Sequence, residues 1–311
     1  MQKLIKIGTR GSLLAMTQST HIKNQIEAQY PGTSVELVKI ITKGDKILDV
    51  PLAKVGGKGL FVKELEEAML SREVDMAVHS MKDVPSELPE ELHIGVVTRR
   101  EDPRDAFLSV KYRSLADLPQ GAKVGTSSLR RKAQLFHARP DLEIHDLRGN
   151  LDTRIRKLDE GVYDAIILAT AGLNRLNWAH RITARFEPVQ MLPAVAQGAV
   201  GIELRRDSAE LLGGLAFLQH EDTTIAVTGE RGFLHRLEGG CQVPIGCHGT
   251  VDGGQLTLTG LVASVDGKQI LKKTLVGPNG EAARLGVALA EELLSMGGKA
   301  ILEEVYGAEL K

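Results

Sequence analysis

The sequence predicts an α/β protein with two lobes of mainly parallel sheet and a smaller C-terminal α+β domain. Short β-rich runs alternate with amphipathic helical patterns over the first two thirds of the chain, which is typical of βαβ units. Polar or Pro-bearing segments at 101–105 and 192–194 interrupt this alternation twice, which indicates that one domain is inserted into another. A length of 311 residues fits two or three domains.

Each element is expected from its own pattern. Runs of aliphatic and β-branched residues bounded by turn residues predict strands at 4–8, 34–42, 76–79, 94–98, 123–125, 143–147, 164–169 and 200–204. Apolar residues that recur three and four positions apart predict helices at 12–28, 60–72, 127–137 and 151–160. From Gly249 the pattern changes to strands at 256–262 and 269–275, joined by the turn Asp266-Gly267, and a helix at 281–294.

These patterns divide the chain into three domains. We expect residues 1–99 and 199–217 to form the first, residues 100–198 to form an inserted second, and residues 218–311 to form the third. No fixed-period repeat or low-complexity tract competes with this division.

Composition excludes several classes of partner. Lys and Arg number 39 against 40 Asp and Glu, so the formal net charge of −1 supplies no field for nucleic acid or an anionic membrane. The N-terminal residues lack the apolar run of a signal peptide, and the longest apolar stretch is too short to cross a bilayer, so we expect a cytoplasmic protein. Cys241 and Cys247 fit no disulfide framework and no zinc spacing, and the nine His are scattered, so no metal is expected.

Two glycine-rich segments fail the nucleotide-binding tests. Lys58 in 54–59 is followed by Gly59 where a phosphate-binding loop requires Ser or Thr. The segment 8–12 after the first strand lacks the G-x-G-x-x-G spacing of a dinucleotide site.

Arginines recur where predicted strands end. Any one of them has the ordinary interpretation of a solvated helix-face residue. Three recurrences at strand ends, where open α/β sheets bind ligands, favour recognition of carboxylate or phosphate. The residues concerned are Arg10 and Ser12, then Thr126, Ser128, Arg130 and Arg131, and then Arg148, Gly149 and Arg154.

Two further positions have both a chemical and a plain interpretation. Asp83 ends a buried strand and is either a catalytic carboxylate or a surface ion-pair partner of Lys82. Cys241 lies among glycines that would let a ligand approach its sulfur, but Cys is most often a small buried hydrophobe. Spacing alone leaves both questions open.

Seven stretches between residues 51 and 246 resemble the porphobilinogen deaminase family, also called hydroxymethylbilane synthases, and the resemblance extends over nearly the whole chain. They are 51–64 (PLAKVGGKGLFVKE), 76–85 (MAVHSMKDVP), 100–107 (REDPRDAF), 124–131 (VGTSSLRR), 147–154 (LRGNLDTR), 164–173 (DAIILATAGL) and 237–246 (LEGGCQVPIG). The resemblance implies three domains, of which the first two are similar to the lobes of periplasmic binding proteins and enclose the active site. It also implies a monomer.

The resemblance further implies a covalent cofactor and a reaction. A dipyrromethane would be attached through a thioether to Cys241. The enzyme would condense four porphobilinogen molecules head to tail, release ammonia at each step, and hydrolyse off the linear tetrapyrrole hydroxymethylbilane for haem biosynthesis. Each pyrrole carries an acetate and a propionate, which accounts for the arginines.

Residue roles follow by motif position. Asp83 matches the catalytic carboxylate, which would interact with pyrrole N–H groups and offset the positive charge of the azafulvene. Lys54 and Lys58 would lie on a loop over the cleft. The residues that would hold the cofactor are Ser80, Lys82, Asp83, Thr126, Ser128, Arg130, Arg131 and Gly149. Those that would bind incoming substrate are Arg10, Ser12, Phe61, Arg148 and Arg154.

Two positions depart from the family pattern. Ala196 stands where the family usually has Gly, and Gly229 stands where it usually has Ala. If position 196 requires a positive φ, its alanine costs on the order of 1 kcal/mol. Neither change touches a proposed chemical group, so any effect falls on interdomain geometry.

Two alternatives belong to other functional classes. One is a two-lobed carboxylate-binding protein without catalysis, in which Cys241 is inert and Asp83 pairs with Lys82. The other is a cysteine-nucleophile hydrolase, but His235 and His248 have no defined geometry beside Cys241.

Overall fold

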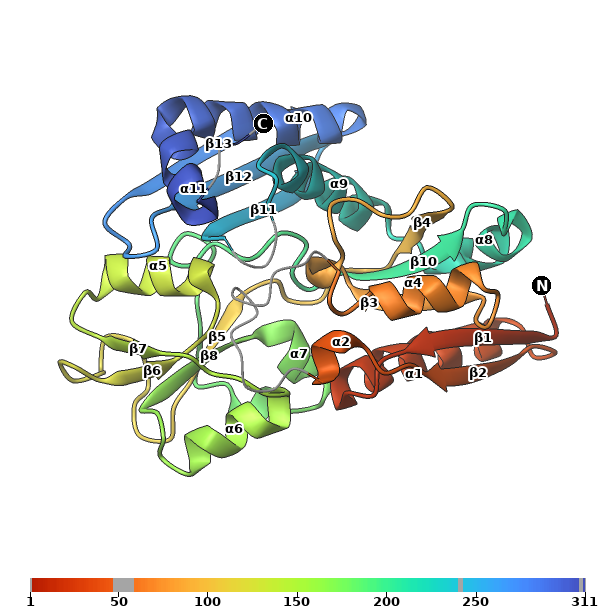
Figure 1. The fold of residues 1–311 in the computed structure, drawn as a ribbon, viewed down its shortest axis with the longest axis horizontal. Helices are drawn as coiled ribbons and strands as arrows, with labels where there is room; N and C mark the ends of the chain where they lie inside the picture. The colour runs from red at the N-terminus through yellow and green to blue at the C-terminus, as the bar shows by residue number, and fades with distance from the viewer. Residues whose placement is uncertain (1, 47–58, 240–242, 308–309, 311) are drawn as a thin grey trace.

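Three sheets organise the chain (Figure 1). The computed structural model describes residues 2–46, 59–239, 243–307 and 310. The two five-stranded sheets form two lobes side by side, and the three-stranded sheet with its helices lies across them, at the top of Figure 1. Within the described part of the chain, none of the helices is both long and apolar enough to cross a membrane.

The first lobe has a five-stranded sheet. Its strands, in spatial order, are β2 (Ser34–Lys39), β1 (Leu4–Thr9), β3 (Met76–Ser80), β10 (Val200–Arg205) and β4 (Leu92–Val97). Strand β1 is parallel to β2 and β3, whereas β10 is antiparallel to both its neighbours, so four strands share one direction. The helices of this lobe are α1 (Leu13–Gln29), α2 (Lys43–Lys46), α4 (Lys63–Leu70) and α8 (Ala209–Leu215).

The second lobe repeats this topology. Its strands, in spatial order, are β7 (Glu143–His145), β6 (Lys123–Gly125), β8 (Ala165–Ala169), β5 (Asp105–Leu108) and β9 (Ala184–Arg185). Strand β5 is antiparallel to both neighbours, and the other four strands run together. The helices are α5 (Leu129–Ala138), α6 (Leu151–Asp159) and α7 (Thr170–Arg175). The prediction of mainly parallel sheets in two lobes is confirmed.

The C-terminal part is an antiparallel sheet covered by helices. Its elements are β11 (Ile245–Asp252), β12 (Gln255–Ala263), β13 (Ile270–Pro278), α9 (Glu221–Arg236), α10 (Ala282–Leu293) and α11 (Lys299–Tyr306). The departure at Gly229 lies where α9 packs closely, because a Cβ there would come within 2.8 Å of both Leu256 and Leu258 and 3.2 Å of the Ala282 carbonyl oxygen. An alanine at 229 would therefore require its neighbours to move.

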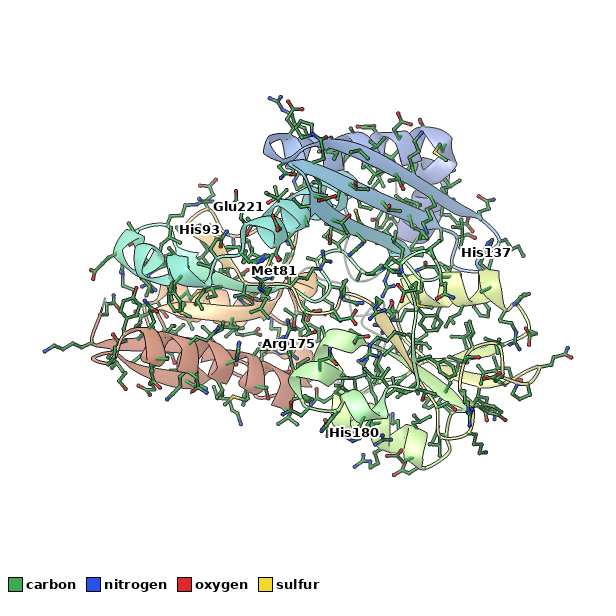
Figure 2. The ribbon with its side chains drawn as sticks, turned by 180° about the vertical axis from the view of Figure 1, so that it is seen from behind. Met81, His93, His137, Arg175, His180 and Glu221 are labelled. Atoms are coloured by element: carbon green, nitrogen blue, oxygen red, sulfur yellow. The ribbon has the colours of Figure 1, made fainter. Side chains whose placement is uncertain are left out.

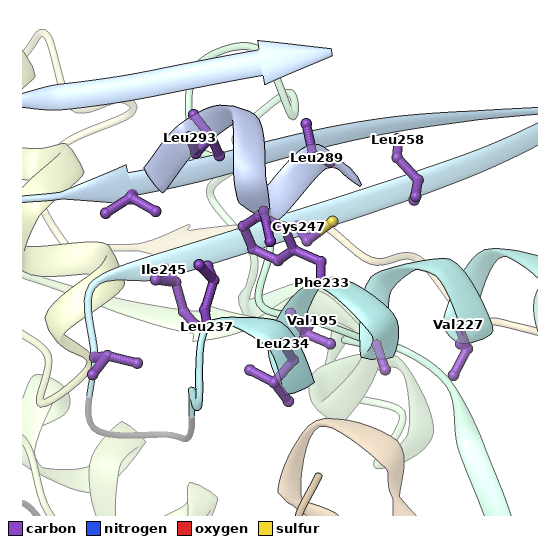
Figure 3. Close-up of a cluster of buried hydrophobic side chains, with 14 of the residues drawn as sticks. Val195, Val227, Phe233, Leu234, Leu237, Ile245, Cys247, Leu258, Leu289 and Leu293 are labelled. Carbon is purple, nitrogen blue, oxygen red and sulfur yellow. The ribbon is translucent and has the colours of Figure 1, made fainter. Parts of the chain in front are cut away.

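Apolar side chains of α9, α10 and β11 form one buried cluster, in which Cys247 lies beside Phe233 (Figure 3). Burial, reinforced by Glu230, raises the pKa of the Cys247 thiol well above its usual value. Met81 and Val84 of the first lobe belong to the same cluster. The C-terminal core therefore extends into the lobe that carries the proposed catalytic carboxylate.

The predicted elements of the first lobe shift by at most a few residues, but the strand that follows the crossing at 101–105 was not predicted. Strand β5 begins at Asp105, directly after the crossing between the lobes. A four-residue strand that is buried at every position has no polar alternation to mark it. Helix α9 was also not predicted.

Candidate active site

Two adjoining cavities lie where the strand ends of the two lobes meet. One is lined by Ser80, Lys82, Arg131, Arg154 and Arg175, among others. The other is lined by residues that include Arg10, Ser12, Phe61, Ser80 and Asp83. Ser80 and Leu14 line both cavities, so the two cavities adjoin and are treated as one site.

Strand β3 delivers three of the predicted residues to this site. Ser80 ends the strand, and the following 3₁₀ turn η1 (Met81–Asp83) carries Lys82 and Asp83. The Gln18 side-chain nitrogen lies 3.0 Å from the Ser80 oxygen, to which it donates a hydrogen bond. Burial lowers the pKa of Lys82, and the charge of Asp83 opposes that shift.

Arg10 and Phe61 face each other in the second cavity. The guanidinium carbon of Arg10 lies 4.2 Å from the centre of the Phe61 ring, a cation–π contact. Arg10 also pairs with Asp45, with its Nη2 2.5 Å from Oδ1. Burial alone would raise the pKa of Asp45, but hydrogen bonds from Arg10 and Thr42 hold it below its usual value.

Helix α5 begins at the site and brings Arg131 into it. Ser128 caps the helix, and its side-chain oxygen accepts from the Arg131 backbone N–H at 3.5 Å. Thr126 accepts from the Ser128 N–H at 3.3 Å, so the two hydroxyls order the turn that begins the helix.

Both arginines of α5 bind one carboxylate that sequence analysis did not identify as functional. The Nη1 of Arg130 lies 2.7 Å from Asp105 Oδ2, and the Nη2 of Arg131 lies 2.6 Å from Asp105 Oδ1. Burial would raise the pKa of Asp105, but the two arginines hold it well below its usual value. Arg131 lines the first cavity, whereas Arg130 is absent from the described lining of both and also donates to the Leu192 carbonyl at 2.6 Å.

The loop before α6 adds Arg148 to the cations of the site, and the helix itself adds Arg154. Gly149 has a φ of +107°, and its carbonyl accepts from the Arg154 Nε at 2.8 Å. Burial lowers the pKa of Arg154 to about 10, helped by the charges of Arg131 and Arg148 and opposed by Asp83. The Nε of Arg148 is buried without a hydrogen-bond partner among the described residues. Arg154 therefore lies close to two other cations, Arg131 and Arg148, and to the carboxylate of Asp83.

Arg175 completes the first cavity and was missed in the sequence. It lies at the end of α7, near the first lobe (Figure 2), and its Nη2 donates to the Gly198 carbonyl at 2.6 Å. Arg175 could have been found by the same criterion as the other arginines, because its helix, α7, directly follows strand β8. Gln18, by contrast, sits in the middle of α1, where nothing local marks it.

Three sequence-predicted residues lie outside the described residues: Cys241, Lys54 and Lys58. The other cysteine, Cys247, is fully buried, and its raised pKa makes it a poor nucleophile.

Comparison with known proteins identifies the family. Residues 5–213 match the family described as porphobilinogen deaminase, dipyromethane cofactor binding domain, and residues 224–295 match the porphobilinogen deaminase C-terminal domain. The chain belongs to the porphobilinogen deaminase family. It is therefore an enzyme of tetrapyrrole biosynthesis with the family's cofactor-binding domain, and the two alternatives from other classes are not supported.

Curated members of the family match nearly end to end. The chain is 58% identical to a porphobilinogen deaminase of Trichlorobacter lovleyi over 308 residues, which cover 99% of this chain and 98% of the relative. It is 55% identical to one from Syntrophobacter fumaroxidans over 306 residues, or 98% of this chain and 99% of the relative.

Solved structures of binding proteins are also similar to parts of the chain. A nutrient binding protein from Burkholderia cenocepacia bound to methionine matches with a TM-score of 0.42 and 16% identity, covering 68% of this chain and 90% of that one. A periplasmic substrate-binding protein of an ABC transporter from Coxiella burnetii matches with a TM-score of 0.44 and 15% identity, covering 68% and 92%.

Proposed function

We propose that this chain condenses four porphobilinogen molecules head to tail with release of ammonia, on a dipyrromethane attached to Cys241, and then hydrolyses off the linear tetrapyrrole. The observation that carries the proposal is that Arg131, Arg148 and Asp83 all lie close enough to Arg154 for their charges to act on it. A site with more guanidinium groups than carboxylates suits substrates that carry two carboxylates on each ring.

The described residues fit a carboxylate-bearing cofactor. Arg131 lines the first cavity beside Ser80 and Lys82. The Nε of Arg148 is buried without a hydrogen-bond partner among the described residues, which is an unused donor that a ligand carboxylate would satisfy. When bound, the cofactor supplies the pyrrole carbon to which the first substrate is joined. The residues proposed to hold it are Ser80, Lys82, Asp83, Thr126, Ser128, Arg130, Arg131 and Gly149.

Substrate binding is proposed for the remaining cations and the ring beside them. Arg10, Arg148 and Arg154 would pair with the acetate and propionate groups of incoming substrate, and Ser12 would donate its hydroxyl. Phe61 presents an aromatic ring at the cavity wall, already packed against the Arg10 guanidinium, on which a pyrrole could stack.

Asp83 is the proposed catalytic group. Its carboxylate would accept the pyrrole N–H and stabilise the positive charge that grows on the substrate as ammonia leaves. Its place in the wall of the second cavity, together with Arg10 and Phe61, supports this role. Lys82 and Arg154, whose charges interact with that of Asp83, lie close to it.

We further propose that residues 1–99 with 199–217, residues 100–198 and residues 218–311 are the domains, and that the enzyme works as a monomer in the cytoplasm. The three separate sheets support the division. A size-exclusion mass near 33.7 kDa would support the monomer, and twice that mass would contradict it.

Two measurements on the purified protein test the function. Intact mass spectrometry is expected to find an added mass equal to two condensed pyrroles. Incubation with porphobilinogen is expected to release ammonia and to yield a linear tetrapyrrole. An unmodified mass together with no ammonia release would overturn the proposal.

A further inference from the structure

The turn that carries Asp83 is held from the C-terminal domain. Met81 and Val84, on either side of Lys82 and Asp83, are both buried in the hydrophobic cluster that contains Phe233 of α9. The two polar residues between them reach the cavities. The apolar side chains of the turn therefore point into the C-terminal core while its polar side chains face the site.

Few backbone hydrogen bonds secure this turn within its own lobe. The Met81 N–H donates to the Ala199 carbonyl at 3.0 Å, and the Val84 N–H donates to the Met81 carbonyl at 3.3 Å. Pro85 has no N–H to donate, so the chain leaves the turn without a backbone donor at that position.

Arg231 of α9 binds the exit of the turn with both ends of its guanidinium group. Its Nη1 donates to the Val84 carbonyl at 3.1 Å and its Nη2 to the Pro85 carbonyl at 2.6 Å. Burial lowers the pKa of Arg231, and the charge of Glu203 opposes that shift. A planar fork on two consecutive carbonyls fixes orientation as well as distance, which a single flexible cation does not do.

We propose that Arg231 is a positioning residue that fixes the carboxylate of Asp83 relative to the C-terminal domain. Helix α9 carries Arg231 and leads, through Leu237 and Gly239, toward the segment with Cys241. One helix thus binds the turn that carries Asp83 and directly precedes the segment with the proposed cofactor anchor in the sequence. The inference rests on the role proposed above for Asp83.

The test compares Arg231→Met and Arg231→Lys with a control on the same helix. Arg236→Met is the control, since Arg236 pairs with Glu291 at 2.5 Å and lines neither cavity within the described residues. Three quantities are measured on each full-length variant: cofactor occupancy by intact mass, kcat and KM for porphobilinogen, and backbone amide exchange in the peptide that spans 80–88.

Arg231→Met is expected to keep cofactor occupancy and KM, to lower kcat by about 10- to 100-fold because the carboxylate is misplaced, and to speed amide exchange at 80–88. Arg231→Lys should recover part of kcat, and Arg236→Met should match the parent in all three. If Arg231→Met keeps the parental kcat and the parental amide exchange, the inference is overturned. It is also overturned if kcat falls only in proportion to a fall in cofactor occupancy. An inactive parent would instead contradict the proposed function, and amide exchange would still decide whether Arg231 holds the turn.

Discussion

At the scale of single residues, the two interpretations of Asp83 predict very different losses of activity when its carboxylate is removed. As a surface partner of Lys82 its removal would change little, because exposed ion pairs contribute about 0 to 1 kcal/mol. As the group that stabilises a cationic substrate, Asp83→Asn should lower kcat at least about 100-fold with little change in KM. Asp83→Glu, which keeps the charge, should retain partial activity. Single-turnover ammonia release from cofactor-loaded protein is the measurement, and an Asp83→Asn rate within tenfold of the parent would contradict the catalytic role.

The two cysteines differ in their expected roles. Cys241→Ser should lack the added mass and all activity, because serine is a much weaker nucleophile than a thiol. Cys247→Ser should keep both, since Cys247 is fully buried in the C-terminal core and its pKa is raised. Peptide mapping of the modified protein decides the matter, and a modification found on Cys247 would refute the assignment.

The arginines are expected to divide between cofactor loading and elongation. Arg131→Leu should lower cofactor loading, because each lost charge-assisted hydrogen bond to a carboxylate costs about 1.5 to 3 kcal/mol. Arg154→Leu, at a residue that bonds the Gly149 carbonyl, should load normally and accumulate enzyme with partial chains. Intact mass spectrometry with limiting porphobilinogen separates the two outcomes, and equal loading defects would disprove the division.

At the scale of elements, helix α4 contains a pH-sensitive carboxyl group. Burial, together with the negative charge of Glu203, raises the pKa of Glu66 from its ordinary 4.5 to about 7. The folded protein therefore holds this proton at pH values where the unfolded chain has lost it, so stability falls as the pH rises from 4.5 to 7.

Glu66→Gln should remove that loss. The melting temperature of the variant relative to the parent is expected to be higher at pH 8 than at pH 5. Glu73→Gln is the control, because Glu73 is exposed just after the same helix and is not among the charges that raise the Glu66 pKa. A difference from the parent that does not change between the two pH values would show that Glu66 titrates normally.

At the scale of the whole molecule, α9 joins the segments that connect the two lobes. Glu230 is fully buried, and its carboxylate binds the Arg100 guanidinium on one connection and the Ala196 N–H on the other, each at 2.5 Å. It also accepts from the Gly249 N–H at 2.8 Å. One carboxylate of the C-terminal domain thus ties both connections to strand β11.

Ala196 adopts the backbone conformation that its family position suggested. Its φ is +56°, which a side chain disfavours by about 1 to 2 kcal/mol. Ala196→Gly should therefore be more stable than Ala199→Gly by about that amount in chemical denaturation. The comparison is matched, because both alanines are 1% exposed and only Ala196 has a positive φ. Equal unfolding free energies for the two variants would show that the positive φ of Ala196 does not destabilise the protein.

The sequence by itself determined which residues gather at the strand ends. The strand at Met76–Ser80 and the cap at Ser128 were predictable because both depend on neighbours within a few positions. The family motifs added the expectation of a reaction and a cofactor.

Only the tertiary structure decided which groups pair with one another. Asp105 binds Arg130, 25 positions away, and Arg231 binds the Val84 carbonyl, 147 positions away. Periodicity and turn chemistry report on local backbone geometry, whereas these contacts depend on how separate sheets and helices pack. The same reason explains why Gln18 and Arg231 were missed, since a helix pattern indicates a buried face without naming its partner.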